Sequence, residues 1–194
     1  PVHLGATPLS VRAVIDHCEP KPGTDYILNN PFAGGTHLPD VTVVRPVFLA
    51  GSLRVSFYVA NRAHHSDVGG VTPGSLPVAT RDAYSDGLTI HDEGICIDPE
   101  PLNESTAERF ITASRLPAER RADLAAQVAA NQAGQARLEQ WASGSKLADL
   151  GTFNTALLDY SARITAQWWK ALPNRTAEAE EYLESDGLSD RPIK

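Results

Sequence analysis

The chain has 194 residues, of which 42% are hydrophobic and 21% are charged, and its formal net charge is −7. This length allows one domain with a sizeable core, or two small lobes. The acidic balance argues against nucleic acid or an anionic membrane as a partner, because both are bound through clustered Lys and Arg. No run approaches the roughly 20 apolar residues that cross a bilayer, and no signal-peptide pattern opens the chain.

Two features bear on where the chain works and how complete it is. Cys18 and Cys96 lack the spacing of a metal site or a disulfide framework, so we expect a reducing compartment, the cytoplasm. The chain contains no methionine and begins at Pro1. We therefore expect a piece of a longer or processed protein.

Residues 1–102 are rich in glycine, proline and β-branched residues, which favours strands and ordered loops. A short strand is expected over residues 26–28. Two β-rich runs, 41–48 and 53–60, are separated by a Gly-Ser turn and predict a hairpin. Alternation in the second run predicts one buried face, formed by Leu53, Val55, Phe57 and Val59. Pro46 in the first run indicates a sheet edge or a bulge.

Residues 103–194 turn to alanine, glutamate, glutamine and arginine, which favours helices. A long helix is expected from Pro117 to about Trp141, and another over about 149–171. The second helix carries an amphipathic stripe that we expect to be core. Its members are Phe153, Leu157, Tyr160, Ile164 and Trp168. The predicted fold class is α+β, with a β-rich segment 1–102 and a helical segment 103–194.

A polar stripe lies on the first of these helices. Asp123, Gln127 and Asn131 are spaced at i, i+4 and i+8, and alanines fill much of the remaining surface. Such a stripe either reaches a partner or a site, or is a solvated helix face. Both interpretations stay open at this point.

Chemistry is expected in two glycine-rich stretches, 29–40 and 60–70, each of which contains a His-x-x-Asp unit. The units are His37/Asp40 and His64/Asp67. An imidazole and a carboxylate that point inward can hold a divalent metal, or act as a base with its orienting carboxylate. A single unit is weak evidence, since many such pairs only cap loops. Two units with flanking diglycines strengthen the metal interpretation.

Other candidates are less specific. His65 adjoins His64, and His91 could complete a metal site or merely cap a turn. Ser75 follows Pro-Gly and is expected in a turn, because the strand–turn–helix context of a nucleophile is missing. The diglycine Gly34-Gly35 lacks the lysine and following helix of a phosphate loop, so no nucleotide site is predicted. His3 has no obvious partner and is expected to be structural.

These motifs, in this order, resemble the hydantoinase B/oxoprolinase family. Residues 31–41 (PFAGGTHLPDV) and 61–70 (NRAHHSDVGG), followed by PGS at 73–75, resemble its two histidine signatures. Further matches are EG at 93–94, I-x-P at 97–99, DLAAQ with AN and Gly134 in the long helix, and Asp186-Gly187. Asn30 departs from the pattern, because the family usually has aspartate there. If that aspartate is a ligand or base, the substitution bears on activity.

The resemblance implies one subunit of an ATP-dependent enzyme. It implies metal ligands at His64 and Asp67, with His91 as a possible third, and a divalent ion such as Zn or Mn. His37, Asp40 and His65 are the candidate catalytic residues. The implied partners are an A-type subunit that binds ATP and phosphorylates the substrate, and the remaining parts of the B-type subunit.

The expected activity is hydrolysis of cyclic amides, such as hydantoins or 5-oxoproline-like lactams, by water activated at the metal-type site. One alternative is a subunit of an acetone- or acetophenone-type ketone carboxylase. Another is a non-catalytic assembly fragment, with the long helix at an interface. The quoted motifs do not separate the hydrolase from the carboxylase, because they build the shared site and not the substrate pocket.

Overall fold

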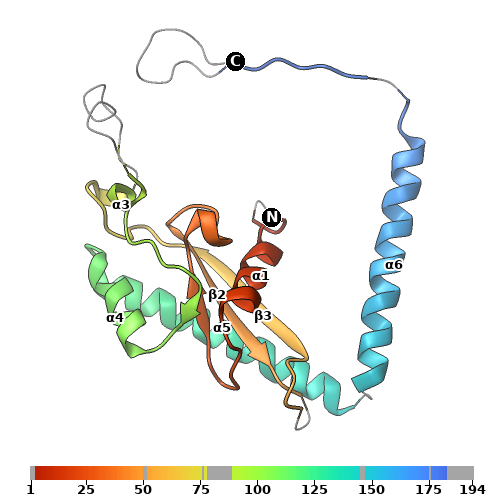
Figure 1. The fold of residues 1–194 in the computed structure, drawn as a ribbon, viewed down its shortest axis with the longest axis horizontal. Helices are drawn as coiled ribbons and strands as arrows, with labels where there is room; N and C mark the ends of the chain where they lie inside the picture. Colours follow the sequence, from red (N-terminus) through yellow and green to blue (C-terminus); the bar gives the residue numbers. More distant parts are fainter. Residues whose placement is uncertain are drawn as a thin grey trace. The chain divides into compact units, whose positions relative to one another are not determined.

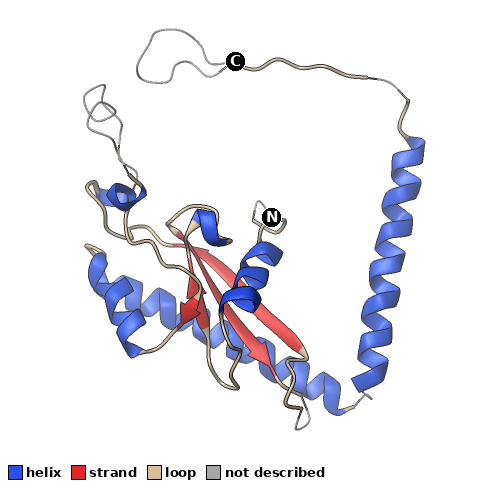
Figure 2. Cartoon of the chain, in the orientation of Figure 1, coloured by secondary structure: helices blue, strands red, loops and turns tan. Residues whose placement is uncertain are grey.

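An antiparallel sheet of four strands, in the order β3-β2-β1-β4, organises the first part of the chain (Figures 1 and 2). The computed structural model describes residues 3–49, 52–75, 77, 89–144, 147–174 and 176–182. The strands are β1 Tyr26–Leu28, β2 Asp40–Val47, β3 Phe57–His64 and β4 Glu100–Pro101. The helices are α1 Thr7–His17, α3 Ile90–Glu93, α4 Glu104–Ala113, α5 Pro117–Ser143 and α6 Leu147–Ala171, with 3-10 turns η1 Pro31–Ala33 and η2 Pro73–Ser75. This is an α+β fold.

Helices cover both faces of the sheet. On one face α1 packs Ala13 and Val14 against Tyr26, Leu28 and Val44. On the other face α4 and α5 enclose a larger core. Its buried members are Ile27, Leu38, Val41, Val43, Val68, Ile97, Phe110, Ile111 and Leu124. Neighbouring residues of a strand point to opposite faces, which is why consecutive valines of β2 divide between the two cores.

The predicted hairpin is present, but its second strand lies further along the chain. The strand over 26–28 is confirmed, and β2 pairs with β3 over its whole length, from Asp40↔His64 to Val47↔Phe57. The expectation that β3 begins at Leu53 is wrong, because Leu53 is 97% exposed in the connecting turn. The Ser52 hydroxyl accepts from the Arg54 amide there and favours a turn over a strand. The strand instead runs from Phe57 to His64 and so includes the first residues of the second histidine motif.

Pro46 occupies a local edge of the sheet. Strand β1 pairs with β2 only at Thr42, Val43 and Val44, so at Pro46 strand β2 has β3 as its one strand partner. Proline lacks the N–H that a strand with two neighbours would need, and a one-sided position tolerates it. The expected edge position is therefore confirmed within an otherwise interior strand.

Helices are not confined to the second half of the chain. Helix α1 lies within the first 102 residues and was not predicted from the sequence pattern, whereas α5 and α6 match the two expected long helices. Two compact units comprise residues 1–138 and 139–194. The segment boundary expected at residue 102 stays a prediction. None of the helices in the described ranges is long and apolar enough to cross a membrane.

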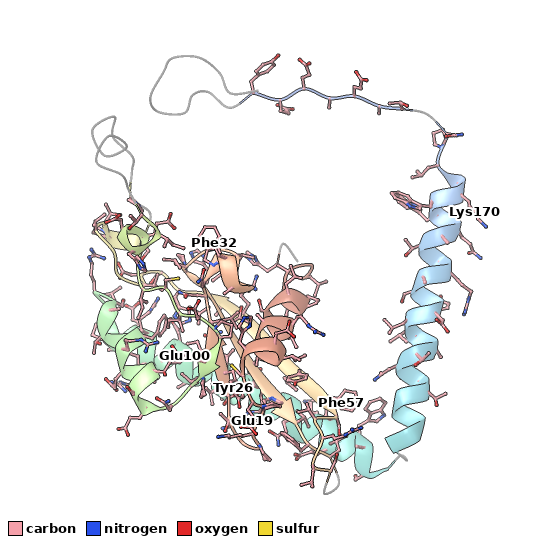
Figure 3. The ribbon with its side chains drawn as sticks, viewed as in Figure 1. Glu19, Tyr26, Phe32, Phe57, Glu100 and Lys170 are labelled. Carbon is pink, nitrogen blue, oxygen red and sulfur yellow. The ribbon has the colours of Figure 1, made fainter. Side chains whose placement is uncertain are left out.

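The apolar stripe of α6 is helical but not buried. Its five members are between 47% and 59% exposed, so their expected core role is wrong within the described chain. Lys170, which is labelled on α6 in Figure 3, is exposed as well. Periodicity identified an apolar face, but it carries no information on what covers that face.

The two kinds of apolar residue predict different mutational costs. Phe110 is fully buried and packs edge-to-face on His65, with ring centroids 5.1 Å apart. We expect Phe110→Ala to lower the free energy of unfolding by about 3–5 kcal/mol, because it leaves a cavity. Ile164→Ala on α6 should change it by less than about 0.5 kcal/mol. Urea denaturation followed by circular dichroism measures both, and equal losses would contradict the assigned core.

Candidate functional site

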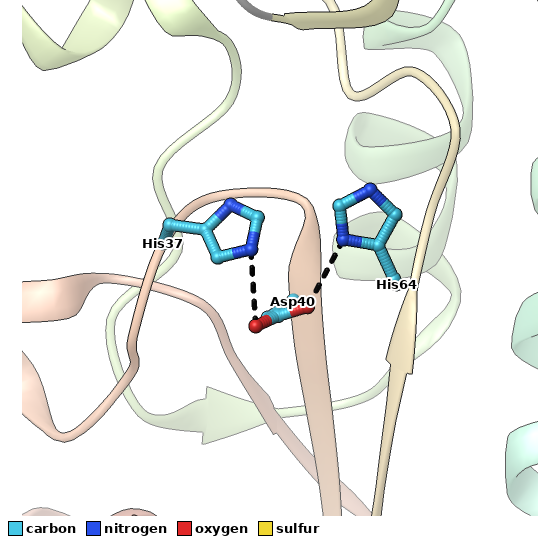
Figure 4. Close-up of side chains that lie close together, drawn as sticks. All are labelled: His37, Asp40 and His64. Atoms are coloured by element: carbon cyan, nitrogen blue, oxygen red, sulfur yellow. Dashed lines mark hydrogen bonds and ion pairs between the residues drawn. The ribbon is translucent and has the colours of Figure 1, made fainter. Parts of the chain in front are cut away.

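One buried carboxylate with three imidazoles around it forms the candidate site. Figure 4 shows the carboxylate of Asp40 with two of these rings, His37 and His64. The Asp40 side chain is 1% exposed. His37 Nε2 lies 3.1 Å from Asp40 Oδ2, and His64 Nδ1 lies 3.2 Å from Asp40 Oδ1. A third ring, that of His3, places Nε2 3.1 Å from Oδ2. The three imidazoles are between 41% and 58% exposed, so the carboxylate is buried beneath rings that face solvent.

Strand pairing brings the two halves of this cluster together. Asp40 is the first residue of β2 and His64 the last of β3, and the two are direct cross-strand partners. Side chains alternate along each strand, so Thr42 and Arg62 lie on the same face as Asp40 and His64. This is the face that α1 covers, since Val44 of the same parity packs against α1.

The loop between β1 and β2 supplies His37 and is held tightly against α1. Gly34 has φ +94°, and a Cβ there would lie 2.7 Å from the Cβ of Ala13. Glycine is therefore required both for its backbone conformation and for the close approach. The loop ends in a turn in which the Asp40 amide donates to the carbonyl of His37. Phe32 stands out from this loop, 87% exposed (Figure 3).

A hydrogen-bond chain from Arg62 supports the carboxylate. The Arg62 guanidinium donates to the hydroxyls of Thr42, Thr36 and Ser10, and the Thr36 hydroxyl in turn donates to Asp40 Oδ2 at 2.9 Å. Burial lowers the pKa of Arg62, while the negative charge of Asp40 raises it. Arg62 and Asp40 therefore interact electrostatically, and the Thr36 hydroxyl links them.

The donor set fits a divalent metal ion. His37, Asp40 and His64 each offer one ligand atom, and these atoms lie within 4.8 Å of one another. It is the only group of three or more His, Cys, Asp or Glu residues of this kind among the described residues. Two imidazoles and a carboxylate suit Zn, Mn or Fe, and the exposure of both rings leaves room for water or substrate.

Asp67, an expected metal ligand, is occupied by protein hydrogen bonds. Its carboxylate accepts from the amides of Gly69, Gly74 and Arg115, from the Ser114 hydroxyl and from the Arg115 guanidinium. Burial on its own would raise the pKa of Asp67, but the amide and guanidinium hydrogen bonds outweigh it and lower the pKa from 3.8 to about 2. These contacts tie the loop after β3 to the α4–α5 connection.

His65 points to the opposite face from His64. It is 1% exposed, and its Nε2–H donates to Gln127 Oε1 at 2.9 Å. The direction of this bond follows from the Gln127 amide, whose Nε2 donates to the Val41 carbonyl and to Asn61 Oδ1. The pKa of His65 is lowered, mainly because the ring is buried. The hydrogen bond with Gln127 acts in the opposite direction, and the positive charge of Arg120 lowers the pKa further. A neutral, buried ring is suited to packing on the core.

The polar stripe of α5 turns out to face the sheet. Gln127 and Asn131 are 4% and 1% exposed, and Asn131 Nδ2 donates to the Val43 carbonyl. Asn61 of β3 donates to both the Gln127 carbonyl and Asn131 Oδ1. For these two residues the solvated-face interpretation is therefore wrong. The third member, Asp123, pairs with Arg120.

The remaining candidates lie outside the cluster. His91 is exposed on α3 and is not grouped with His64. Ser75 is in the expected turn, where its hydroxyl donates to the Gly69 carbonyl. Asn30 caps η1 and donates its Nδ2–H to Asp98 at 2.7 Å. An aspartate at position 30 would oppose Asp98, so the amide has a structural reason of its own in this chain.

Three residues of the site were not predicted from the sequence. Thr36 and Arg62 lie inside the two histidine motifs. Arg62 is two residues before His64 in the same strand, so its side chain points to the same face, and this spacing could have identified it. His3 gave none, because its partner is 37 positions away and becomes visible only when α1 is placed on the sheet.

Together the fold and the cluster define an α+β protein with an imidazole–carboxylate site at the end of a β-hairpin. The family model described as hydantoinase B/oxoprolinase matches residues 1–194, and the chain belongs to that family.

Known relatives are considerably longer than this chain. The 5-oxoprolinase of Saccharomyces cerevisiae is 35% identical over 194 residues, which cover 94% of this chain and 14% of the relative. The ATP-dependent caprolactamase from Pseudomonas jessenii superimposes with a TM-score of 0.77 at 25% identity, over 93% of this chain and 32% of that one. Nucleotide-free acetone carboxylase shares the fold, with a TM-score of 0.56 at 17% identity over 74% of this chain and 19% of that one.

The hydrogen bonds of Asp67 predict a pH-dependent stability. Its pKa is about 2 in the folded chain against 3.8 unfolded, so the ionised form stabilises the fold above pH 4. This contribution, about 2 kcal/mol, is lost as the pH falls from about 4 to 2. Asp67→Asn should lower stability at neutral pH by about 3 kcal/mol, because its amide group opposes donors. Urea titrations at pH 7 and pH 3 measure this, and an unchanged pH dependence in the variant would contradict it.

Proposed function

We propose that this chain carries the hydrolytic site of a B-type subunit of an ATP-dependent enzyme that opens cyclic amides, such as hydantoins or 5-oxoproline-like lactams. An A-type partner subunit binds ATP and phosphorylates the substrate oxygen. The site on this chain then directs water to the activated carbon. We place the enzyme in the cytoplasm, assembled with the remaining parts of the B-type subunit.

The observation that carries the proposal is the Asp40 cluster in a chain of this family. His37, Asp40 and His64 would hold the ion, in place of the set His64, Asp67 and His91 that the resemblance implied. An ion bound there would polarise a carbonyl oxygen and make a bound water more acidic. The saturated hydrogen bonding of Asp67 favours a structural role for that residue, and the burial of His65 favours one for His65.

The residues around the cluster hold it ready for chemistry. Arg62 and Thr36 hold the Asp40 carboxylate in a fixed direction, so little reorganisation is needed when a ligand arrives. The exposed edges of the His37 and His64 rings present the site to solvent, where a substrate carried by the partner subunit would enter. A metal-free alternative uses His37 as a base oriented by Asp40.

Ketone carboxylation is the second candidate reaction, because acetone carboxylase has the same fold over part of its chain. A non-catalytic assembly role is the third, and the exposed apolar face of α6 favours it. Both draw on the same family and fold. Reaction assays separate the first two candidates, and metal analysis separates the third.

Metal content tests the ligand set. We expect stoichiometric divalent metal in the complete, purified complex, and a loss of affinity of more than about 100-fold in His37→Ala and Asp40→Ala, since even outer-shell changes cost 10–100-fold. His91→Ala, and the control His17→Ala on α1, should keep the metal. Elemental analysis after dialysis measures this. Metal loss in His91→Ala would instead support the ligand set His64, Asp67 and His91. A metal-free wild type would favour either His37 as a metal-free base or a non-catalytic assembly role.

Substrate assays test the reaction. With ATP and a hydantoin or 5-oxoproline, the complete complex should release phosphate and open the ring, and Asp40→Ala should slow turnover by at least about 100-fold. With ATP, bicarbonate and acetone, no acetoacetate should form. Carboxylation of acetone without amide hydrolysis would overturn the hydrolase proposal in favour of the carboxylase.

A further inference from the structure

We infer that His3 is a positioning residue for the candidate metal site: its Nε2, 3.1 Å from Asp40 Oδ2, holds the carboxylate in place, while His3 itself stays outside the ligand set. The inference rests on the proposed function, because it assigns an outer-shell role around the proposed ion. It concerns a residue that the sequence pattern left without a partner.

The backbone of His3 is anchored where α1 begins. Its carbonyl accepts hydrogen bonds from the amides of Ala6 and Thr7 at 3.1 Å each, and from the Thr7 hydroxyl at 3.0 Å. Helix α1 is fixed to the sheet in turn, through Ala13 and Val14 in its core. The ring of His3 is therefore delivered to Asp40 by a rigid element, as an accurately placed site requires.

The two oxygens of Asp40 have different surroundings. Among the described residues, Oδ2 has three polar neighbours, His3, His37 and Thr36, whereas Oδ1 has His64 alone. The Thr36 hydroxyl donates to Oδ2, and His3 Nε2 lies against the same oxygen at 3.1 Å, so the protein already surrounds Oδ2. Oδ1 is left as the oxygen with more room for an ion, and the contact of His3 with Oδ2 sets the plane in which Oδ1 is presented.

His3 lies beside the ligand group without joining it. The atoms of His37, Asp40 and His64 lie within 4.8 Å of one another, and His3 is not part of that group even though it contacts Asp40. The ring is 41% exposed, so it is not held there by burial in the core. A polar contact to an acidic ligand from outside the set is the usual arrangement of a residue that tunes affinity and orientation.

Cobalt binding to the complete complex separates the possible roles of His3. The apo complex is titrated with Co²⁺, affinity is measured against a competing chelator, and the visible absorption reports the ligands. We expect His3→Ala to bind 10–100-fold more weakly with the wild-type spectrum. His3→Gln, whose side-chain amide can restore a polar contact with Asp40 Oδ2, should bind within a few-fold of wild type. His64→Ala should change the spectrum, and His17→Ala should change neither quantity.

Each contrary result has a distinct meaning. Unchanged affinity in His3→Ala, or no rescue by His3→Gln, overturns the positioning role while the metal site stands. A spectral change in His3→Ala that matches His64→Ala overturns the inference by making His3 a ligand. A wild-type complex that binds no Co²⁺ overturns the proposed site, and the role of His3 with it. Circular dichroism of each variant establishes that the fold is retained.

Discussion

The antiparallel pairing of Asp40 with His64 is the constraint on which the rest of the site depends. Side chains of a strand alternate between faces, so this single register decides which residues of β2 and β3 meet α1 and which meet α5. Asp40, Arg62 and His64 turn to the α1 side, where the candidate site lies. A slip by one residue would exchange the two sets and place the carboxylate in the apolar core.

The same alternation explains how two adjacent histidines have different environments. His64 ends on the solvent-facing rim of the α1 side, and His65 lies on the α5 side between Phe110 and Gln127. The peptide bond between His64 and His65 thus links the candidate site directly to the core. The side-chain amides of Gln127 and Asn131 on α5 donate to carbonyls of β2, and Asn61 of β3 hydrogen-bonds to the same two residues. The strand that carries His64 is therefore held to α5 through Asn61.

Local sequence patterns predicted the hairpin, the long helices and the two histidine motifs, because periodicity and turn chemistry are properties of neighbouring residues. They grouped His64 with Asp67, whereas the structure places His64 beside Asp40. Asp67 is three positions away, but its carboxylate is bound by Arg115, 48 positions further on. Asp40 is 24 positions away and is brought to His64 by strand pairing. His3 and the exposed stripe of α6 show the same limit, since a contact or a covering partner is not encoded in spacing.

The turn between β2 and β3 lies at the end of the hairpin remote from the site. Seven strand steps separate Val47 from Asp40, which is roughly 23 Å at 3.3 Å per residue. Leu53 in this turn is almost completely exposed. Loop length and composition can therefore drift here during evolution without disturbing the histidines. The same turn is a suitable attachment point for a spectroscopic label, which would report on the protein while leaving its chemistry untouched.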